Sequence, residues 1–237
     1  MPQNRAILFF SKTPQINRTN RDEPFAALPW EDLDSLFTAM LGDIVENACR
    51  IEPVDIILYR DSSEQSDDFL SRFQGRVDFR NAFEGSFSEQ VQQSIDVAFA
   101  QDYHQLVVIL DNHPLIASEI IENVFHQLGY EDDCIVFGPT NEGKPYLLGI
   151  KSNYSGIFNI SGGNPTTNPQ LMMERLCQCE TVLFPLRLSY ALDSGFNLEK
   201  LRQDVETLAL QDELFPHRTH EMFKMFGKKY KTRKTLR

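Results

Sequence analysis

Short apolar runs alternate along the chain with longer segments in which apolar residues recur every three or four positions. The first pattern is typical of buried strands and the second of amphipathic helices. Strands are therefore predicted at residues 6–10, 54–59, 77–80, 106–110, 134–137, 146–150 and 182–188. Helices are predicted at residues 32–48, 65–73, 86–100, 118–128, 168–179 and 198–208. Strands that alternate with helices indicate an α/β fold with a mostly parallel sheet.

Two of the predicted helices begin with recognisable capping residues. Ser86 and Glu89 have the spacing of a capping box, in which each side chain bonds the backbone N–H of the other residue. Asn168 stands directly before Pro169, and proline is favoured at the first helical position. We therefore expect helices to begin at these two places.

Polar clusters follow two of the predicted strands. Asp111-Asn112-His113-Pro114 comes after the strand at 106–110, and residues 138–145 separate the strands at 134–137 and 146–150. In an open α/β sheet, ligands bind outside the carboxyl ends of the strands. The chemistry of the protein is therefore expected at these two clusters.

Both clusters also resemble a known family. The segment from Asp111 to Leu115 is similar to a Ser-Asp-Cys-Pro-x-Leu motif, and residues 138–150 are similar, without a gap, to Gly-Pro-Ala-x-Asp-Gly-Gly-Tyr-Tyr-Leu-Ile-Gly-Leu. These motifs belong to the radical-SAM/selenodomain-associated "transferase 1" group, which is related to MobA-like nucleotidyltransferases. The resemblance runs from Ile7 to about Leu201. It implies a three-layer α/β/α, GT-A-like fold with a mostly parallel mixed sheet.

The resemblance also implies an activity, the transfer of a glycosyl or nucleotidyl group from a nucleotide-sugar or a nucleoside triphosphate. On the matching positions, Asp111 and Glu142 would be the catalytic carboxylates and would hold Mg²⁺ or Mn²⁺, ions that prefer oxygen ligands. Gly143 would allow close approach of the ligand. Asn112 and Lys144 would contact the nucleotide or its phosphates.

Three further motifs supply more candidate residues. Ser11-Lys12-Thr13-Pro14 is similar to the opening of the family's nucleotide-binding segment, so Lys12 and Arg18 are candidate phosphate contacts. Glu89 falls on the Glu of a Leu-Gly-Glu-Arg segment. Asp193 falls on the first Asp of an Asp-Val-Asp-Thr motif. Glu89 and Asp193 would orient the acceptor, or would position the residues that bind the ligand or the metal ion.

Several positions depart from the family pattern. Asn112 stands at the position of the family's Asp, Lys144 replaces a Gly, Gly195 replaces the second Asp of the late motif, and the Lys-Thr-Arg-Leu run near the N-terminus is absent. Because a fold can persist without its activity, a second hypothesis stays open. The chain would then be a degenerate relative that binds a ligand or a partner without turnover.

Charge separates the body of the chain from its end. The net charge is −11, yet residues 217–237 hold eight Lys or Arg and one Glu, so residues 1–216 carry −18. An acidic body argues against nucleic-acid binding. We predict one domain at 1–216 and a basic tail at 217–237. The tail would dock as a short helix through four apolar residues, on the body or on a second subunit in a homodimer: Met222, Phe223, Met225 and Phe226. A third hypothesis is an interaction protein that uses this tail.

Three features that the sequence lacks bear on the expected cellular location. No apolar run approaches the about 20 residues that span a bilayer. The apolar run at 6–10 is too short for a signal peptide. The four cysteines lack the spacing of a zinc or redox site, so free thiols are expected. A cytoplasmic protein is the resulting expectation.

Overall fold

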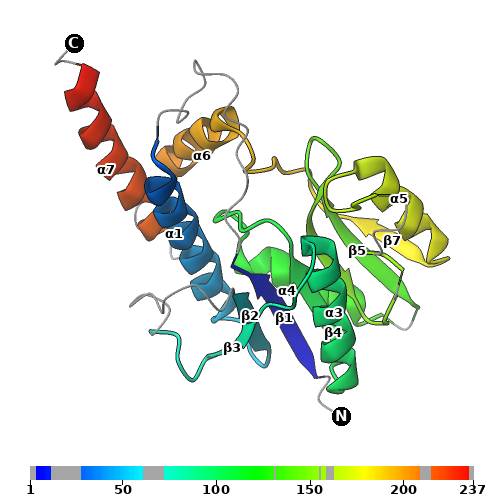
Figure 1. Cartoon of the computed structure of the whole chain (residues 1–237). Helices are drawn as coiled ribbons and strands as arrows, with labels where there is room; N and C mark the ends of the chain where they lie inside the picture. Colours follow the sequence, from blue (N-terminus) through cyan, green and yellow to red (C-terminus); the bar gives the residue numbers. More distant parts are fainter. Residues whose placement is uncertain are drawn as a thin grey trace.

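The computed structural model describes residues 4–11, 28–60, 72–130, 132–154, 156–158, 163–208 and 215–234. Within these residues a seven-stranded sheet has the order β3-β2-β1-β4-β6-β5-β7 (Figure 1). The strands are β1 (Arg5–Phe10), β2 (Asp55–Arg60), β3 (Val77–Asn81), β4 (Gln105–Ile109), β5 (Cys134–Pro139), β6 (Pro145–Ile150) and β7 (Val182–Pro185). All neighbours pair in parallel except β6, which is antiparallel to both β4 and β5. The predicted mostly parallel, mixed sheet is confirmed.

The described helices alternate with these strands as the sequence pattern predicted. They are α1 (Trp30–Ala48), α3 (Phe87–Ala100), α4 (Ser118–Leu128), α5 (Pro169–Gln178), α6 (Gly195–Thr207) and α7 (His217–Lys234). Most of the helix predicted at 65–73 lies outside the described residues, and Arg72 and Phe73 form a turn. No helix in the described part of the chain is long and apolar enough to cross a membrane. The four cysteines are free thiols.

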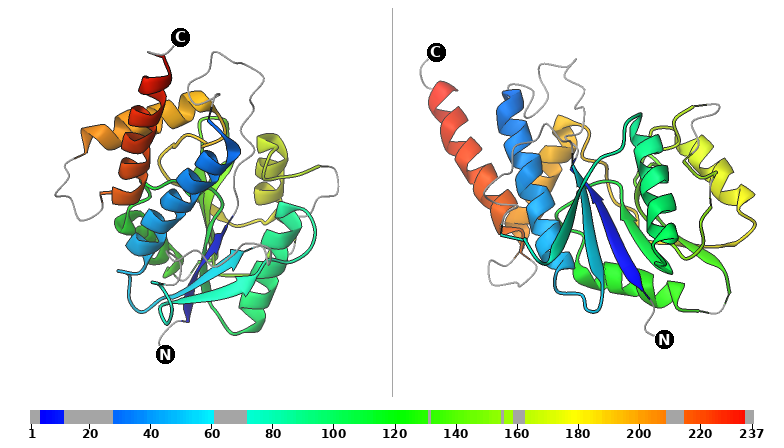
Figure 2. Two further views of the ribbon diagram at one scale, coloured as in Figure 1. Left: turned by 60° about the vertical axis from the view of Figure 1, so that its left-hand side comes forward. Right: turned by 60° about the horizontal axis from the view of Figure 1, so that its bottom comes forward.

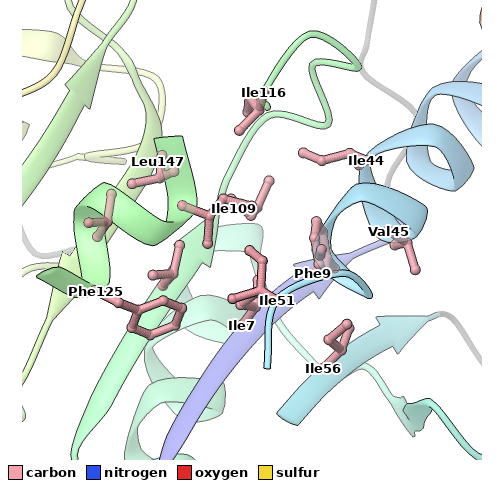
Figure 3. Close-up of a cluster of buried hydrophobic side chains, with 14 of the residues drawn as sticks. Ile7, Phe9, Ile44, Val45, Ile51, Ile56, Ile109, Ile116, Phe125 and Leu147 are labelled. Atoms are coloured by element: carbon pink, nitrogen blue, oxygen red, sulfur yellow. The ribbon is translucent and has the colours of Figure 1, made fainter. Parts of the chain in front are cut away.

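The two faces of the sheet bury different helices. Alternate residues of a strand point to opposite faces, and in β1 Ile7 and Phe9 join a cluster that includes Ile44 of α1 and Phe125 of α4 (Figure 3). The alternate residues of β1, including Leu8, join a second cluster with side chains of α3 and α5. Figure 2 shows α1 and α3 on opposite sides of the sheet. This is the three-layer α/β/α arrangement.

Capping side chains set the starts of three helices. Ser86 and Glu89 form the predicted capping box at α3. The Asn168 side chain accepts a hydrogen bond from the Leu171 N–H at 3.2 Å, with Pro169 as the first residue of α5. Ser194 caps α6 in the same way, so this helix begins at Gly195 rather than at the predicted residue 198. Local residue types therefore decide where these helices begin.

The basic C-terminal segment forms α7 and packs along α1 (Figure 1). Phe223 and Phe226 of α7 are buried in a third cluster with side chains of α1 and α6. Asp43 of α1 accepts hydrogen bonds from the Thr219 N–H at 2.8 Å and from the Arg218 N–H at 3.2 Å, at the start of α7. The segment thus docks on the body of the chain, one of the two places expected for it.

Candidate functional site

A cavity of about 360 Å³ lies at the carboxyl ends of β1 and β4. Phe10 ends β1, Leu110 and Asp111 follow β4, and the turn between β5 and β6 closes another side. In this sheet order the chain leaves β1 first toward β2 and later toward β4, so the cavity lies at the point where strand order reverses. Its polar lining comes from Asp111, Asn112, Thr140, Lys144, Thr166, Thr167 and Asp193. The predicted location of the site at the strand ends agrees with this cavity.

Asn112 joins the ends of the two central strands. Its side-chain amide donates a hydrogen bond to the Phe10 carbonyl at 2.9 Å. Its Oδ1 atom is buried and has no hydrogen-bond partner in the part of the chain that the structure describes. A buried acceptor is costly to leave unsatisfied. Through its amide, Asn112 ties the loop after β4 to the end of β1 at the wall of the cavity.

Asp111 is held from the opposite side of the cavity. Its Oδ2 atom accepts a hydrogen bond at 3.1 Å from the backbone N–H of Leu192, in the segment before α6. Burial raises the pKa of Asp111 to about 7, and the negative charge of Asp193 adds to this effect. The Leu192 N–H and the charge of Lys144 act in the opposite direction. A carboxyl group that titrates near neutrality is suited to proton transfer.

Lys144 links two acidic residues across the cavity mouth. Its Nζ atom lies 2.6 Å from Oδ2 of Asp193 and 2.8 Å from Oε2 of Glu142. Burial alone would lower the pKa of Lys144, but the hydrogen bonds to Asp193 and Glu142 outweigh it and raise that pKa. Lys144 is therefore a charged ammonium held between two carboxylates, with 27% of its side chain exposed.

Gly143 shapes the turn that presents Lys144. Its φ of +77° lies in the left-handed region that favours glycine. The Gly143 N–H donates to the Thr140 carbonyl at 2.7 Å, and the Thr140 N–H donates to the Lys144 carbonyl at 2.7 Å. A Cβ atom on Gly143 would lie 2.9 Å from Cβ of Pro169. Gly143 does not line the cavity, so its closest observed approach is to α5 rather than to a ligand position.

These contacts bear on the divalent ion expected on Asp111 and Glu142. Glu142 is already bound to Lys144, and Asp111 is bound to the Leu192 N–H. Among the described residues, no three His, Cys, Asp or Glu side chains gather as ligands of a metal ion. The donor set therefore does not fit a divalent ion shared by these two carboxylates. The expected Mg²⁺ or Mn²⁺ stays a prediction.

Comparison with known proteins adds two kinds of similarity. A model of the family described as "Uncharacterized protein conserved in bacteria (DUF2064)" matches residues 44–161, a stretch that includes Asp111 and Glu142. Comparison with curated proteins gives no match. Among solved structures, a provisionally named nucleotide-diphospho-sugar transferase from Desulfovibrio desulfuricans G20 is 16% identical with a TM-score of 0.70. That alignment covers 94% of this chain and 95% of the other.

Two further solved structures support the same arrangement of strands and helices. A cytidylyltransferase from Leptospira borgpetersenii serovar Hardjo-bovis is 13% identical with a TM-score of 0.56, over 96% of this chain and 94% of the other. A 4-diphosphocytidyl-2C-methyl-D-erythritol synthase from Anaerococcus prevotii is 8% identical with a TM-score of 0.54, over 94% of this chain and 96% of the other. The chain has a GT-A-like fold. At such low identities the similarity shows the fold alone.

Within this GT-A-like fold, Glu89 lies away from the cavity lining. Its Oε2 atom accepts hydrogen bonds from the N–H and the O–H of Ser86, both at 2.7 Å. These bonds lower the pKa of Glu89 below that of a free carboxyl group. The observed contacts give Glu89 a role at the start of α3. Its predicted part in orienting the acceptor has no contact to support it.

His113 does not belong to the cavity lining. The side chain is buried, and this burial lowers the pKa of His113 to about 4, so the ring is neutral at pH 7. Its Nδ1 atom accepts a hydrogen bond from the Leu115 N–H at 3.3 Å, and its ring packs edge-on against Tyr190 at 4.7 Å. His113 is a loop residue that packs between segments rather than a metal ligand.

The two remaining predicted phosphate contacts, Lys12 and Arg18, lie outside the described residues. Of the predicted site residues, the structure therefore brings Asp111, Asn112, Lys144 and Asp193 into the cavity lining. Glu142 joins them through Lys144.

The residues predicted for the site leave out two parts of the cavity wall. Thr166 and Thr167 line it, and Asn164 positions them by accepting hydrogen bonds from the hydroxyls of Ser88 at 2.6 Å and Thr166 at 2.7 Å. The composition of residues 161–168, rich in Gly, Asn, Pro and Thr, predicts a loop beside the site but not which of its residues reach the cavity. The Leu192 N–H is a backbone group, so no residue type could have marked it.

Proposed function

We propose that the cavity binds the phosphate-bearing part of a nucleotide or nucleotide-sugar, and that the protein transfers a glycosyl or nucleotidyl group. One observation carries this proposal. The ammonium of Lys144 and the carboxyl group of Asp111, whose pKa is about 7, line the same cavity at the point where the strand order reverses. The GT-A-like fold supports it, as do the activities after which the similar solved structures are named.

Each residue has a chemical part in this proposal. Lys144 would bind a phosphate oxygen and stabilise the negative charge that builds on the leaving phosphate. Asp111 in its ionised form would accept the proton of an acceptor hydroxyl as that oxygen attacks the donor. In glycosyl transfer the bond from the sugar carbon to the phosphate oxygen would break, and the nucleotide would leave with the electron pair. In nucleotidyl transfer the attack would be on phosphorus, with pyrophosphate leaving.

The apolar part of the cavity suits the remainder of such a ligand. Phe10 and Phe87 both line it, with ring centroids 5.5 Å apart and ring planes at 85°. Aromatic walls of this kind contact the faces of bases and sugars.

A thermal-shift titration with a panel of nucleotides and nucleotide-sugars tests the proposal. A ligand at 100 times its dissociation constant stabilises the folded state by about 2.7 kcal/mol, which is a measurable shift. We expect at least one member of the panel to give such a shift. Absence of any shift across the panel, with and without Mg²⁺ or Mn²⁺, would contradict the proposal.

Asp111→Asn then separates binding from transfer. Because Asn keeps the shape of the side chain and loses the basic oxygen, donor binding should change only a few-fold while kcat falls by about 10²–10⁴. Asp34→Asn, on the exposed face of α1, is the matched control and should change neither value. Equal kcat for Asp111→Asn and the wild type would remove Asp111 from the proposed chemistry.

The second candidate is a binding protein without turnover. Lys144 is already paired with both Glu142 and Asp193, and this pairing favours an altered chemistry. The same titration decides between the two candidates when it is followed by product analysis. A ligand that stabilises the protein, yet gives no transferred product with any acceptor in the assay, would favour the binding protein.

A further inference from the structure

We infer that the ammonium of Lys144 is the resident cation of this site, and that it lets a diphosphate group bind in the cavity without a divalent metal ion. The inference deepens the proposed function and rests on it. It concerns how the site supplies positive charge to its ligand.

The position of the ammonium carries the first step. Nζ of Lys144 lies 2.6 Å from Asp193 and 2.8 Å from Glu142, the spacing of charge-assisted hydrogen bonds. An ammonium has three N–H donors. Two are directed to these carboxylates, and because Lys144 lines the cavity we assign the third to an anionic oxygen of the ligand.

The turn that carries Lys144 is fixed on both sides, so the ammonium is held in place before a ligand arrives. The Lys144 N–H donates to Oγ1 of Thr140 at 3.1 Å, and its carbonyl accepts from the Thr140 N–H at 2.7 Å. The Asn141 N–H donates to the Ser189 carbonyl at 2.8 Å, and the Ser189 N–H donates to the Pro139 carbonyl at 3.0 Å. These bonds tie the turn to the segment that follows β7.

The same position disfavours a divalent ion. An ion bound to Asp193 or Glu142 would have to break a contact of Lys144, and it would then lie next to a positive charge. Repulsion between like charges weakens binding most where the groups are partly removed from water, as here. Asp111, the remaining carboxyl group in the lining, is also a poor metal ligand when it is protonated.

Calorimetric titration of the full-length protein tests the inference with two probes, inorganic pyrophosphate and Mn²⁺ alone. The wild type should bind pyrophosphate in EDTA. Lys144→Met should weaken that binding at least about tenfold, the loss expected for one charged hydrogen bond. Lys144→Arg should restore most of it. Lys224→Met, at a lysine of α7 that pairs with Glu221, is the matched control and should bind as the wild type does.

The metal titration gives an independent result. The wild type should bind Mn²⁺ weakly, and Lys144→Met should bind it at least about tenfold more tightly, because Glu142 and Asp193 are then released from a positive neighbour. Adding Asp193→Asn to Lys144→Met should abolish the gain. A Mn²⁺ affinity that is the same in the wild type and in Lys144→Met would overturn the inference.

Pyrophosphate binding by the wild type alone also tests the inference, in case a variant does not fold. Pyrophosphate binding that requires Mg²⁺ or Mn²⁺ would overturn the inference and leave the proposed function standing. Binding of neither pyrophosphate nor any nucleotide, with or without the metal ions, would overturn both. Binding in EDTA supports the inference.

Discussion

Carboxyl groups of similar intrinsic acidity acquire different properties in this protein because their surroundings differ. Burial raises the pKa of Asp111 to about 7, whereas hydrogen bonds from Ser86 lower the pKa of Glu89. Asp193 and Glu142 instead share one ammonium, that of Lys144. The sequence assigned all four residues to the site, but only their neighbours decide what each can do.

The raised pKa of Asp111 makes stability depend on pH. In the unfolded chain this group ionises near pH 3.9, so between pH 4 and about 7 the unfolded state loses a proton that the folded state keeps. The folded state is therefore destabilised as pH rises through this window and is unaffected below it. The ionisable groups that face Asp111 are Lys144, Asp193 and Tyr190.

Asp111→Asn should remove this penalty. The variant should be more stable than the wild type at pH 8, by on the order of 4 kcal/mol, and close to it at pH 4. Urea denaturation of both proteins at the two pH values measures the difference. A stability difference that is the same at pH 4 and pH 8 would show that Asp111 ionises at its ordinary pKa in the folded protein.

At the scale of elements, helix starts and the sheet follow from local pattern. α3 begins after Ser86 and α5 after Asn168, as their capping residues predicted. Strand β1 alternates between two core clusters because successive side chains point to opposite faces. The turn between β5 and β6 depends on Gly143, whose positive φ an L side chain adopts only with strain.

The capping box of α3 gives a prediction that also tests the role of Glu89. Ser86→Ala should lower the free energy of unfolding by about 1 kcal/mol. Glu89→Gln should weaken the cap and leave nucleotide binding unchanged, because Glu89 bonds Ser86 and does not line the cavity. Gln93→Ala, on the exposed face of α3, is the control. Loss of ligand binding in Glu89→Gln, without a matching loss in Ser86→Ala, would return Glu89 to the site.

At the scale of the whole molecule, the basic C-terminal segment is attached to the acidic body by one buried carboxylate. Asp43 is 4% exposed and accepts bonds from the backbone N–H groups of Arg218 and Thr219. The Arg218 guanidinium pairs with Asp43 at 3.2 Å and also with Glu46. Burial of Phe223 and Phe226 completes the contact. The separate tail expected from charge is, over its described residues, a helix packed on α1.

Removing this carboxylate should loosen α7. Asp43→Ala leaves the N–H groups of Arg218 and Thr219 and the Thr219 hydroxyl without their acceptor, and should cost about 2–3 kcal/mol of stability. Glu46→Gln removes only the half-exposed partner of Arg218 and should cost less than about 1 kcal/mol. Hydrogen exchange of α7 amides measures both effects. Exchange in α7 that is equally slow in Asp43→Ala and the wild type would show that the apolar contacts alone hold the helix.

Local rules explain how much of the fold and site could be predicted. The apolar runs within residues 106–110 and 134–150 predicted strands. The polar residues that follow these runs predicted the edge of the sheet at which the cavity lies, because ligands bind at the carboxyl ends of strands in such sheets. The contact between Lys144 and Asp193 spans 49 positions in the chain. That between Asp111 and the Leu192 N–H spans 81. No periodicity or motif connects residues so far apart.

The sequence by itself determined the order of strands and helices along the chain, two of the helix caps and the edge of the sheet where the polar clusters lie. These features depend on neighbours within a few positions, whose backbone preferences and side-chain spacing are present in the chain before it folds. Only the tertiary structure decided that Lys144 lies between Glu142 and Asp193, that Asp111 is desolvated, and that α7 rests on Asp43. Charge pairing and desolvation depend on distance through space, and folding sets those distances.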